Sequence, residues 1–219
     1  MHREKFYDED LSVQPHSNAI KTLAGEELGF ALLMKYFKRQ NPNVEYLQNV
    51  RCTTGNRKGP RLDGWLKESA VNGEVVYYQV EVKSWSIHGV GGNSKPLEYK
   101  CTQARLAEFK QPEWQRYWAD GRFKDPTLNK VLTMMKPPCR DAKVKPLACV
   151  WTAIHPNGEA TPFFEVDTAG NQHFDSVSVF SMSGFLRGLG QEYLELDLPI
   201  TSERIQWLQR IFCVTGEKT

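Results

Sequence analysis

The chain has 219 residues, of which 40% are hydrophobic and 25% are charged, and its formal net charge is +2. This length is enough for one full-sized core, and because no apolar run approaches the about 20 residues of a membrane-spanning helix, we expect no membrane segment. The five cysteines include no Cys-x-x-Cys pair, which argues against a disulfide scaffold or a zinc or iron–sulfur site and favours reduced thiols in a cytoplasmic protein.

The N-terminal part of the chain predicts an arm followed by one long helix. Residues 1–16 show no apolar periodicity, and their polar character argues against a secretory signal. Ser17 or Asn18 can cap a helix that runs to about Arg39, since apolar residues recur there every three or four positions. Asn41-Pro42-Asn43 ends this helix. We expect a first strand over 44–51 and then a polar, basic loop over 53–60.

The next predicted element is a β-hairpin around Asn72-Gly73. A two-residue turn would place Asp63 opposite Val82 and turn Glu81 to the other face of the sheet. A three-residue loop, with Gly73 in the left-handed conformation, would instead place Asp63 opposite Glu81. We prefer the second register because it separates polar from apolar residues on both strands. Its other facing pairs are Trp65 with Gln79, Leu62 with Val82 and Leu66 with Tyr78.

The rest of the chain predicts a mixture of strands and helices. A glycine-rich loop over 86–95 precedes helices at 97–110 and 112–118, and 147–154 is an apolar run of strand length. Further strands are expected at 163–166 and 177–182, and short helices at 183–189 and 202–212. This order predicts an α/β (α+β) fold, in which a central mixed sheet is flanked by helices. We expect a core over 17–155 and a β-β-α extension over 156–219 that packs on the same domain.

Charge is distributed unevenly over this second part. Residues 95–145 contain 12 Lys and Arg against 6 Asp and Glu, whereas residues 146–219 contain 4 against 9. A basic segment of this kind is typical of a face that binds a polyanion. A solvated helix surface would produce the same pattern, so both interpretations stay open.

The second hairpin strand carries three polar residues at alternating positions. Gln79, Glu81 and Lys83 point to one face of the sheet, while Val80 and Val82 point to the other, where they can pack under the long helix. A charged group near a core is unfavourable unless it is paired or bound to a metal. The alternative is a plain Glu–Lys ladder on a solvent-exposed face, which is common in antiparallel sheets.

The spacing of these residues resembles the signature of the PD-(D/E)XK nuclease superfamily, which has the restriction-endonuclease-like fold. Pro60-Arg61-Leu62-Asp63 stands where the family has its Pro-Asp element, although here Pro60 does not adjoin Asp63. Glu81-Val82-Lys83 matches the (D/E)-x-K element, and Gln79 completes an alternating Gln-x-Glu-x-Lys strand. Gly25-Glu26-Glu27 resembles the Gly-Glu element on the first helix of small resolvase-like members. The resemblance covers about residues 20–155 and does not extend into 156–219.

The resemblance implies a restriction-endonuclease-like core and a specific set of site residues. Asp63, Glu81, the backbone carbonyl of Val82 and Glu26 would bind Mg²⁺, which Mn²⁺ would replace, with Glu27 as the alternative to Glu26. Lys83 would orient or deprotonate the attacking water, and Gln79 would position the site. The residues expected to contact nucleic acid are Arg57, Lys58, Lys95, Lys100 and Arg105.

The resulting hypothesis is a Mg²⁺-dependent endonuclease that hydrolyses DNA in restriction, defence or mobile-element DNA processing. Its partners would be DNA and either a second copy of the chain or a subunit of a multi-protein system. One alternative is a catalytically silent nuclease-fold module that binds nucleic acid within a larger complex. Another is a metal-free structural protein in which the Glu–Lys ladder is surface pairing.

Overall fold

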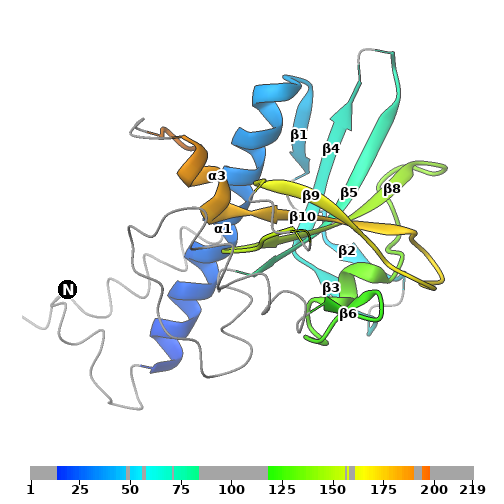
Figure 1. Cartoon of the computed structure of the whole chain (residues 1–219), viewed down its shortest axis with the longest axis horizontal. Helices are drawn as coiled ribbons and strands as arrows, with labels where there is room; N and C mark the ends of the chain where they lie inside the picture. The colour runs from blue at the N-terminus through cyan, green and yellow to red at the C-terminus, as the bar shows by residue number, and fades with distance from the viewer. Residues whose placement is uncertain are drawn as a thin grey trace, which may run out of the picture.

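The computed structural model describes residues 14–47, 50–55, 58–70, 72–83, 118–155, 157, 161–189 and 194–197. Within them, two α-helices pack against one face of a six-stranded mixed sheet whose strand order is β1-β4-β5-β8-β10-β9 (Figure 1). This arrangement confirms the predicted mixed α/β (α+β) class with a central mixed sheet. None of the helices in the described residues is long and apolar enough to cross a membrane.

Helix α1 spans Gln14–Gln40, so residues 14–16 are helical and do not belong to the arm predicted over 1–16. The helix ends near the predicted position, because the residue before Pro42 disfavours helical geometry. The Asn41 N–H makes the last helical bond to the carbonyl of Phe37 at 2.8 Å. Gly29 brings α1 close to the sheet, since a Cβ at this position would lie 2.5 Å from Cγ1 of Val82.

Three antiparallel strands form one side of the sheet. Strand β1, Val44–Leu47, pairs with β4, Gly64–Ser69, and β4 pairs in turn with β5, Val75–Lys83. Strand β1 is shorter than the predicted 44–51, and residues 48–49 lie outside the described part of the chain. Two short strands, β2 (Cys52–Thr53) and β3 (Arg61–Leu62), pair separately ahead of β4.

The hairpin of β4 and β5 has the predicted register. Trp65 faces Gln79 and Leu66 faces Tyr78. The N–H of Ala70 donates to the carbonyl of Glu74 at 2.8 Å, and Gly73 has a φ of +85°. The three-residue loop with a left-handed glycine is therefore confirmed.

The predicted pairing is wrong at the start of the hairpin. The Asp63 N–H donates to the carbonyl of Val80 at 3.0 Å, although Gly64 is already the register partner of Val80. Asp63 is thus the extra residue of a β-bulge, and the alternation of side chains shifts by one position before it. For this reason Leu62 does not face Val82, but packs into the core on the opposite face of the sheet.

The other side of the sheet is partly parallel. Strand β8, Lys143–Val150, runs parallel to β5, and β10, Ser176–Ser181, runs parallel to β8. Strand β9, Phe163–Asp167, pairs antiparallel with β10 at the edge, and α3 spans Met182–Gly188. Strands β9 and β10 and helix α3 lie where the sequence predicts them. Strand β8 begins four residues before the predicted Leu147 and ends at Val150, because its polar first half pairs with β5.

The face of the sheet opposite α1 is covered by the segment 118–136. It contains β6 (Trp118–Ala119), β7 (Arg122–Phe123) and the 3-10 helix η3 (Asn129–Leu132), which lie near β2 and β3 in Figure 1. Trp118, predicted to end a helix, instead lies in β6, since Asp120 and Gly121 turn the chain with φ of 55° and 69°. The predicted helices over 97–110, 112–117 and 202–212 fall outside the described residues.

Two hydrophobic clusters make up the core, one on each face of the sheet. The cluster under α1 and α3 contains Val80 and Val82, as the alternation in β5 predicts. The other cluster packs Trp65 and Ala148 against Val131 and Met135 of the covering segment. Strand β5 is therefore buried on both faces, so any polar residue along its middle is removed from water.

Candidate functional site

Two polar side chains of β5 are buried on the face opposite α1. Gln79 is fully buried and Glu81 is 2% exposed, whereas Lys83 at the strand end is partly exposed. Strand alternation places all three on the same face, beside the cluster that contains Trp65. The sequence thus puts a carboxylate where water cannot solvate it, which is unfavourable unless a cation or a proton compensates.

Lys83 pairs with only one of the two oxygens of the Glu81 carboxylate. Its Nζ forms an ion pair with Oε1 of Glu81, but Oε2 is buried and has no hydrogen-bond partner among the described residues. Burial raises the pKa of Glu81, and Lys83 and then Lys130 oppose this rise. Glu81 therefore retains one oxygen that is able to accept a further cation or proton.

The bulge directs the Asp63 carboxyl toward the same part of β5. Oδ2 of Asp63 accepts a hydrogen bond from the N–H of Val82 at 2.7 Å. Burial, followed by the negative charges of Glu81 and Glu26, raises the pKa of Asp63 to about 7. The N–H and C=O of a strand residue point to the same side of the strand. The Val82 carbonyl, a predicted metal ligand, therefore also faces the bulge.

Helix α1 adds a third carboxyl to this group. Glu26 is close enough to Asp63 and Glu81 to raise the pKa of both. Glu27, the alternative in the sequence, is 4% exposed. The structure thus brings Glu26, Asp63, Glu81 and Lys83 near one another.

Tyr46 of β1 is a neighbour that the sequence interpretation missed. Its ring packs against Phe30 in a tilted arrangement at a centroid distance of 4.4 Å, and a Cβ on Gly64 would lie 2.9 Å from this ring. Burial, then Asp63 and Glu26, raises the pKa of Tyr46 to about 12. A signal for this position was present, since Val44 and Tyr46 alternate on a strand and so share the face toward α1.

Cys52 lies on the other side of the bulge. Its Sγ donates to the carbonyl of Gly64 at 2.9 Å, and burial raises the pKa of its thiol. A neutral, buried thiol is a poor metal ligand and a poor nucleophile. Cys52 therefore supports the backbone next to Asp63 and does not extend the site.

Gln79 uses its amide to hold the covering segment. Its Nε2 donates to the carbonyl of Val131 at 2.6 Å and to that of Thr133 at 2.9 Å, and its Oε1 accepts from the N–H of Met135 at 3.0 Å. Both amide hydrogens are committed to backbone carbonyls, so Gln79 is a positioning residue and has no donor left for a substrate.

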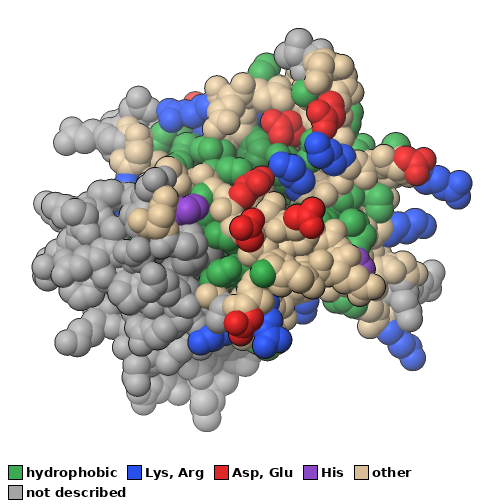
Figure 2. Space-filling view, turned by 45° about the vertical axis from the view of Figure 1, so that its right-hand side comes forward, with side chains coloured by type: hydrophobic (Ala, Val, Ile, Leu, Met, Phe, Trp, Pro, Cys, Tyr) green, Lys and Arg blue, Asp and Glu red, His purple; other side chains and the backbone are tan. Residues whose placement is uncertain are grey.

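The predicted nucleic-acid contacts are mostly untested by the structure. Lys58 is exposed in the turn before β3, whereas Arg57, Lys95, Lys100 and Arg105 lie outside the described residues. On the face shown in Figure 2, the described Lys and Arg side chains lie among Asp and Glu side chains and do not form one continuous basic patch. The basic character of 95–145 therefore stays a sequence-based prediction.

The donor set of the site suits a hard divalent cation. The Asp63 carboxyl lies on the Val82 backbone and near the charge of Glu81. Carboxylate and carbonyl oxygens are the ligands that Mg²⁺ takes from proteins while it keeps several waters. In the described part of the chain, no three His, Cys, Asp or Glu side chains are close enough to hold a metal ion by themselves. Water and substrate oxygens would therefore have to supply part of the coordination, as an open catalytic site requires.

Comparisons with known proteins do not assign the chain to a family. No protein-family model matches it. The search of the curated proteins and the search of the solved structures likewise gave no significant match. The function therefore has to be inferred from the residues and their geometry.

Proposed function

We propose that this protein is a Mg²⁺-dependent nuclease that hydrolyses DNA phosphodiester bonds, with Asp63, Glu81 and Lys83 as its catalytic residues. The observation that carries the proposal is the buried Glu81 carboxylate, whose Oε2 has no hydrogen-bond partner among the described residues while the Asp63 charge lies nearby. A protein tolerates such an arrangement poorly without a ligand, and strongly perturbed carboxyl groups cluster at functional sites.

The position of these residues in the sheet supports a restriction-endonuclease-like core. The motif strand β5 lies in the middle of a mixed sheet, between the antiparallel β4 and the parallel β8. The long helix α1 crosses directly over β5 at Gly29 and contributes Glu26. Asp63, from the bulge before β4, thus lies near Glu81 and Lys83 at one end of β5.

Each residue would have one task in hydrolysis. Asp63, Glu81 and the Val82 carbonyl would hold Mg²⁺, with Glu26 reaching it directly or through water, and the bound ion would lower the pKa of a water and polarise the phosphate. Ionised Asp63 keeps its Oδ2 on the Val82 N–H, which fixes the direction of the carboxyl. Lys83 would turn from Glu81 to the attacking water and offset the negative charge that develops on the phosphate.

A plasmid-nicking assay with Mg²⁺ or Mn²⁺ tests the proposal. We expect the wild type to nick supercoiled DNA, and Asp63→Asn, Glu81→Gln and Lys83→Met each to lose on the order of 10²–10⁴-fold in rate. Glu74→Gln is the matched control, because Glu74 also pairs with a lysine but is exposed at the other end of the hairpin.

Two results would count against nuclease activity. Equal nicking by all four variants would remove the catalytic assignment, since the activity would then come from elsewhere or from a contaminant. A wild type that binds DNA without cutting it under any metal condition would instead favour the silent nucleic-acid-binding module.

A further inference from the structure

The segment 129–136 is fixed to the strands on both sides of the bulge. Gln79 holds it to β5 through the three backbone hydrogen bonds described above. At its far end the N–H of Lys136 donates to the carbonyl of Thr53 in β2 at 2.8 Å. The segment therefore spans from the strand that carries Glu81 to β2, which pairs with β3, the strand directly before Asp63.

Apolar packing makes the position of this segment rigid. Val131 and Met135 are fully buried and Leu132 is 5% exposed, all within the cluster that contains Trp65. Upstream, the Asp125 carboxylate accepts from the N–H and the hydroxyl of Thr127, at 2.7 and 2.8 Å, and so closes the turn that leads into η3. A segment with this many fixed contacts can hold a side chain at a defined place.

Lys130 is the charged residue that this segment brings to the site. It precedes Val131, whose carbonyl Gln79 holds, and it is half-buried. Gln79 and Glu81 point to the same face of β5, so this anchor places Lys130 on the side of the strand that carries Glu81. The charge of Lys130 lowers the pKa of the Glu81 carboxyl. In the described part of the chain Lys130 forms no ion pair.

The charge of Lys130 decides the net charge of the group of residues around the bulge. Glu26, Asp63 and Glu81 bring three negative charges when ionised, and Lys83 and Lys130 bring two positive ones. With a divalent cation the group would have a net charge of about +1, which suits a phosphodiester; without Lys130 it would be neutral. The second lysine thus changes whether the loaded site attracts its substrate.

We propose that Lys130 is a phosphate-contacting residue, held by the Gln79 amide on the face of the site that DNA approaches. The proposal rests on the nuclease function and adds to it a cation from outside the Asp63 to Lys83 stretch. The competing explanation is that Lys130 only neutralises Glu81 and stabilises the fold. The two explanations differ in whether the removal of Lys130 changes the salt dependence of DNA binding.

The test compares Lys130→Met with Lys136→Met in the full chain. Methionine keeps the length of the side chain without its charge, and Lys136 is an exposed lysine on the same segment that engages Thr53 through its backbone. Binding to a short DNA duplex is measured over a range of salt concentrations with Ca²⁺, which supplies the divalent charge, and plasmid nicking is measured with Mg²⁺. Thermal unfolding verifies that both variants fold.

We expect Lys130→Met to slow nicking at least about tenfold and to lower the slope of log affinity against log salt by about one. Lys130→Arg should restore most of the rate and the slope, and Lys136→Met should behave as the wild type. If Lys130→Met does not fold, Lys130→Gln is measured in the same way.

If a folded Lys130→Met variant nicks DNA at the wild-type rate and has the wild-type salt slope, the proposed role of Lys130 is overturned. The nuclease function is then left intact. A wild type that binds DNA but does not nick it would overturn the nuclease function. In that case an unchanged slope in Lys130→Met would overturn the phosphate contact as well, and a reduced slope would support it. A wild type without DNA binding overturns both.

Discussion

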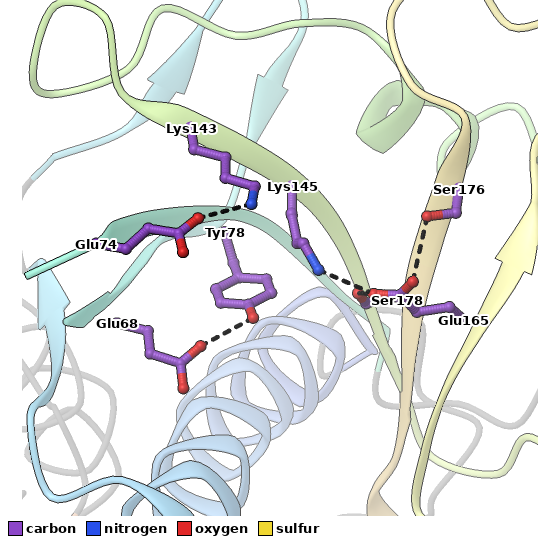
Figure 3. Close-up of polar contacts among 8 residues, drawn as sticks. All are labelled: Glu68, Glu74, Tyr78, Lys143, Lys145, Glu165, Ser176 and Ser178. Carbon is purple, nitrogen blue, oxygen red and sulfur yellow. Dashed lines mark hydrogen bonds and ion pairs between the residues drawn. The ribbon is translucent and has the colours of Figure 1, made fainter. Parts of the chain in front are cut away.

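The two ends of the β4–β5 hairpin carry the same residue types in opposite surroundings. Near the turn, Glu74 pairs with Lys143 at 2.7 Å, and Lys145 of β8 pairs with Glu165 of β9 at 3.1 Å; we call these four residues the outer ladder (Figure 3). At the other end Glu81 pairs with Lys83, the inner pair. The side chains of Glu74 and Lys143 are 48% and 57% exposed, against 3% and 14% for Glu81 and Lys83.

The outer ladder and the inner pair also differ in their hydrogen bonds. In the outer ladder Glu165 also lies within reach of the hydroxyls of Ser176 and Ser178, and the hydroxyl of Tyr78 donates to Glu68 at 2.9 Å (Figure 3). In the inner pair Oε2 of Glu81 has no partner among the described residues. The surface ladder that the sequence offered as an alternative is therefore found at the turn end. Exposed pairs of this kind contribute little energy, whereas a buried carboxylate must be compensated.

The largest difference in stability between the inner pair and the outer ladder should appear when one lysine is removed from each. We expect Lys83→Met to lower the free energy of unfolding at pH 8 by about 3–5 kcal/mol, because it leaves the buried Glu81 charge without its ion-pair partner. Lys143→Met should leave it unchanged within error, since water solvates Glu74. Urea unfolding measures both values.

The double variant Glu81→Gln/Lys83→Met controls for the loss of the lysine stem. It should recover most of the stability, because the Glu81 charge is removed together with its ion-pair partner. Equal losses in Lys83→Met and Lys143→Met would show that the inner pair is as well solvated as the outer ladder.

A second difference should appear in the pH dependence of stability. Burial and two neighbouring carboxylates raise the pKa of Asp63 from its ordinary 3.8 to about 7, so the folded state binds this proton more tightly than the unfolded state. Its contribution to stability is fully present below pH 4 and is lost as the pH rises through 7. Asp63→Asn removes this loss, and we expect the variant to gain about 1–3 kcal/mol over the wild type between pH 4 and 8.

Glu74, in the outer ladder, should change the stability with pH in the opposite direction, and Glu74→Gln tests this. Lys143 lowers the pKa of Glu74, so that the small contribution of this carboxylate is present at neutral pH and is lost on acidification. Unfolding free energies are measured for both variants from pH 4 to 8. A difference between Asp63→Asn and the wild type that stays constant with pH would show that Asp63 is ionised throughout.

The sequence predicted the hairpin register because two independent signals agreed. Side chains alternate with a period of two, and Asn72-Gly73 supplies the left-handed residue that a three-residue loop needs. The burial of Val80 and Val82 under the long helix follows from the same alternation. These signals are local, so the central strands and the inner pair could be recognised without tertiary information.

The sequence failed where one residue or a distant segment decides the geometry. The bulge at Asp63 inserts a residue without breaking the apolar pattern, and only Gly64, crowded by Tyr46 and Phe30, hints at it. Lys130 reaches the site through a segment that Gln79 holds from about fifty positions away in the chain, which no local pattern reveals. The Asp120-Gly121 turn was a signal that could have corrected the placement of Trp118.

The smallest difference should appear in the rise in Tm that Mg²⁺ causes. This measurement tests the cation site without requiring catalysis. A ligand present at ten times its dissociation constant stabilises the folded state by about 1.4 kcal/mol, which for a chain of this size is about 3–6 °C in Tm. We expect this rise for the wild type and for Glu74→Gln, because the ion would relieve the repulsion between Asp63 and Glu81. Asp63→Asn and Glu81→Gln should show little or none of it, since each loses one of the two charges that attract the ion. An equal rise in all four proteins would mean that Mg²⁺ binds elsewhere, and the inner pair would then differ from the outer ladder in burial alone.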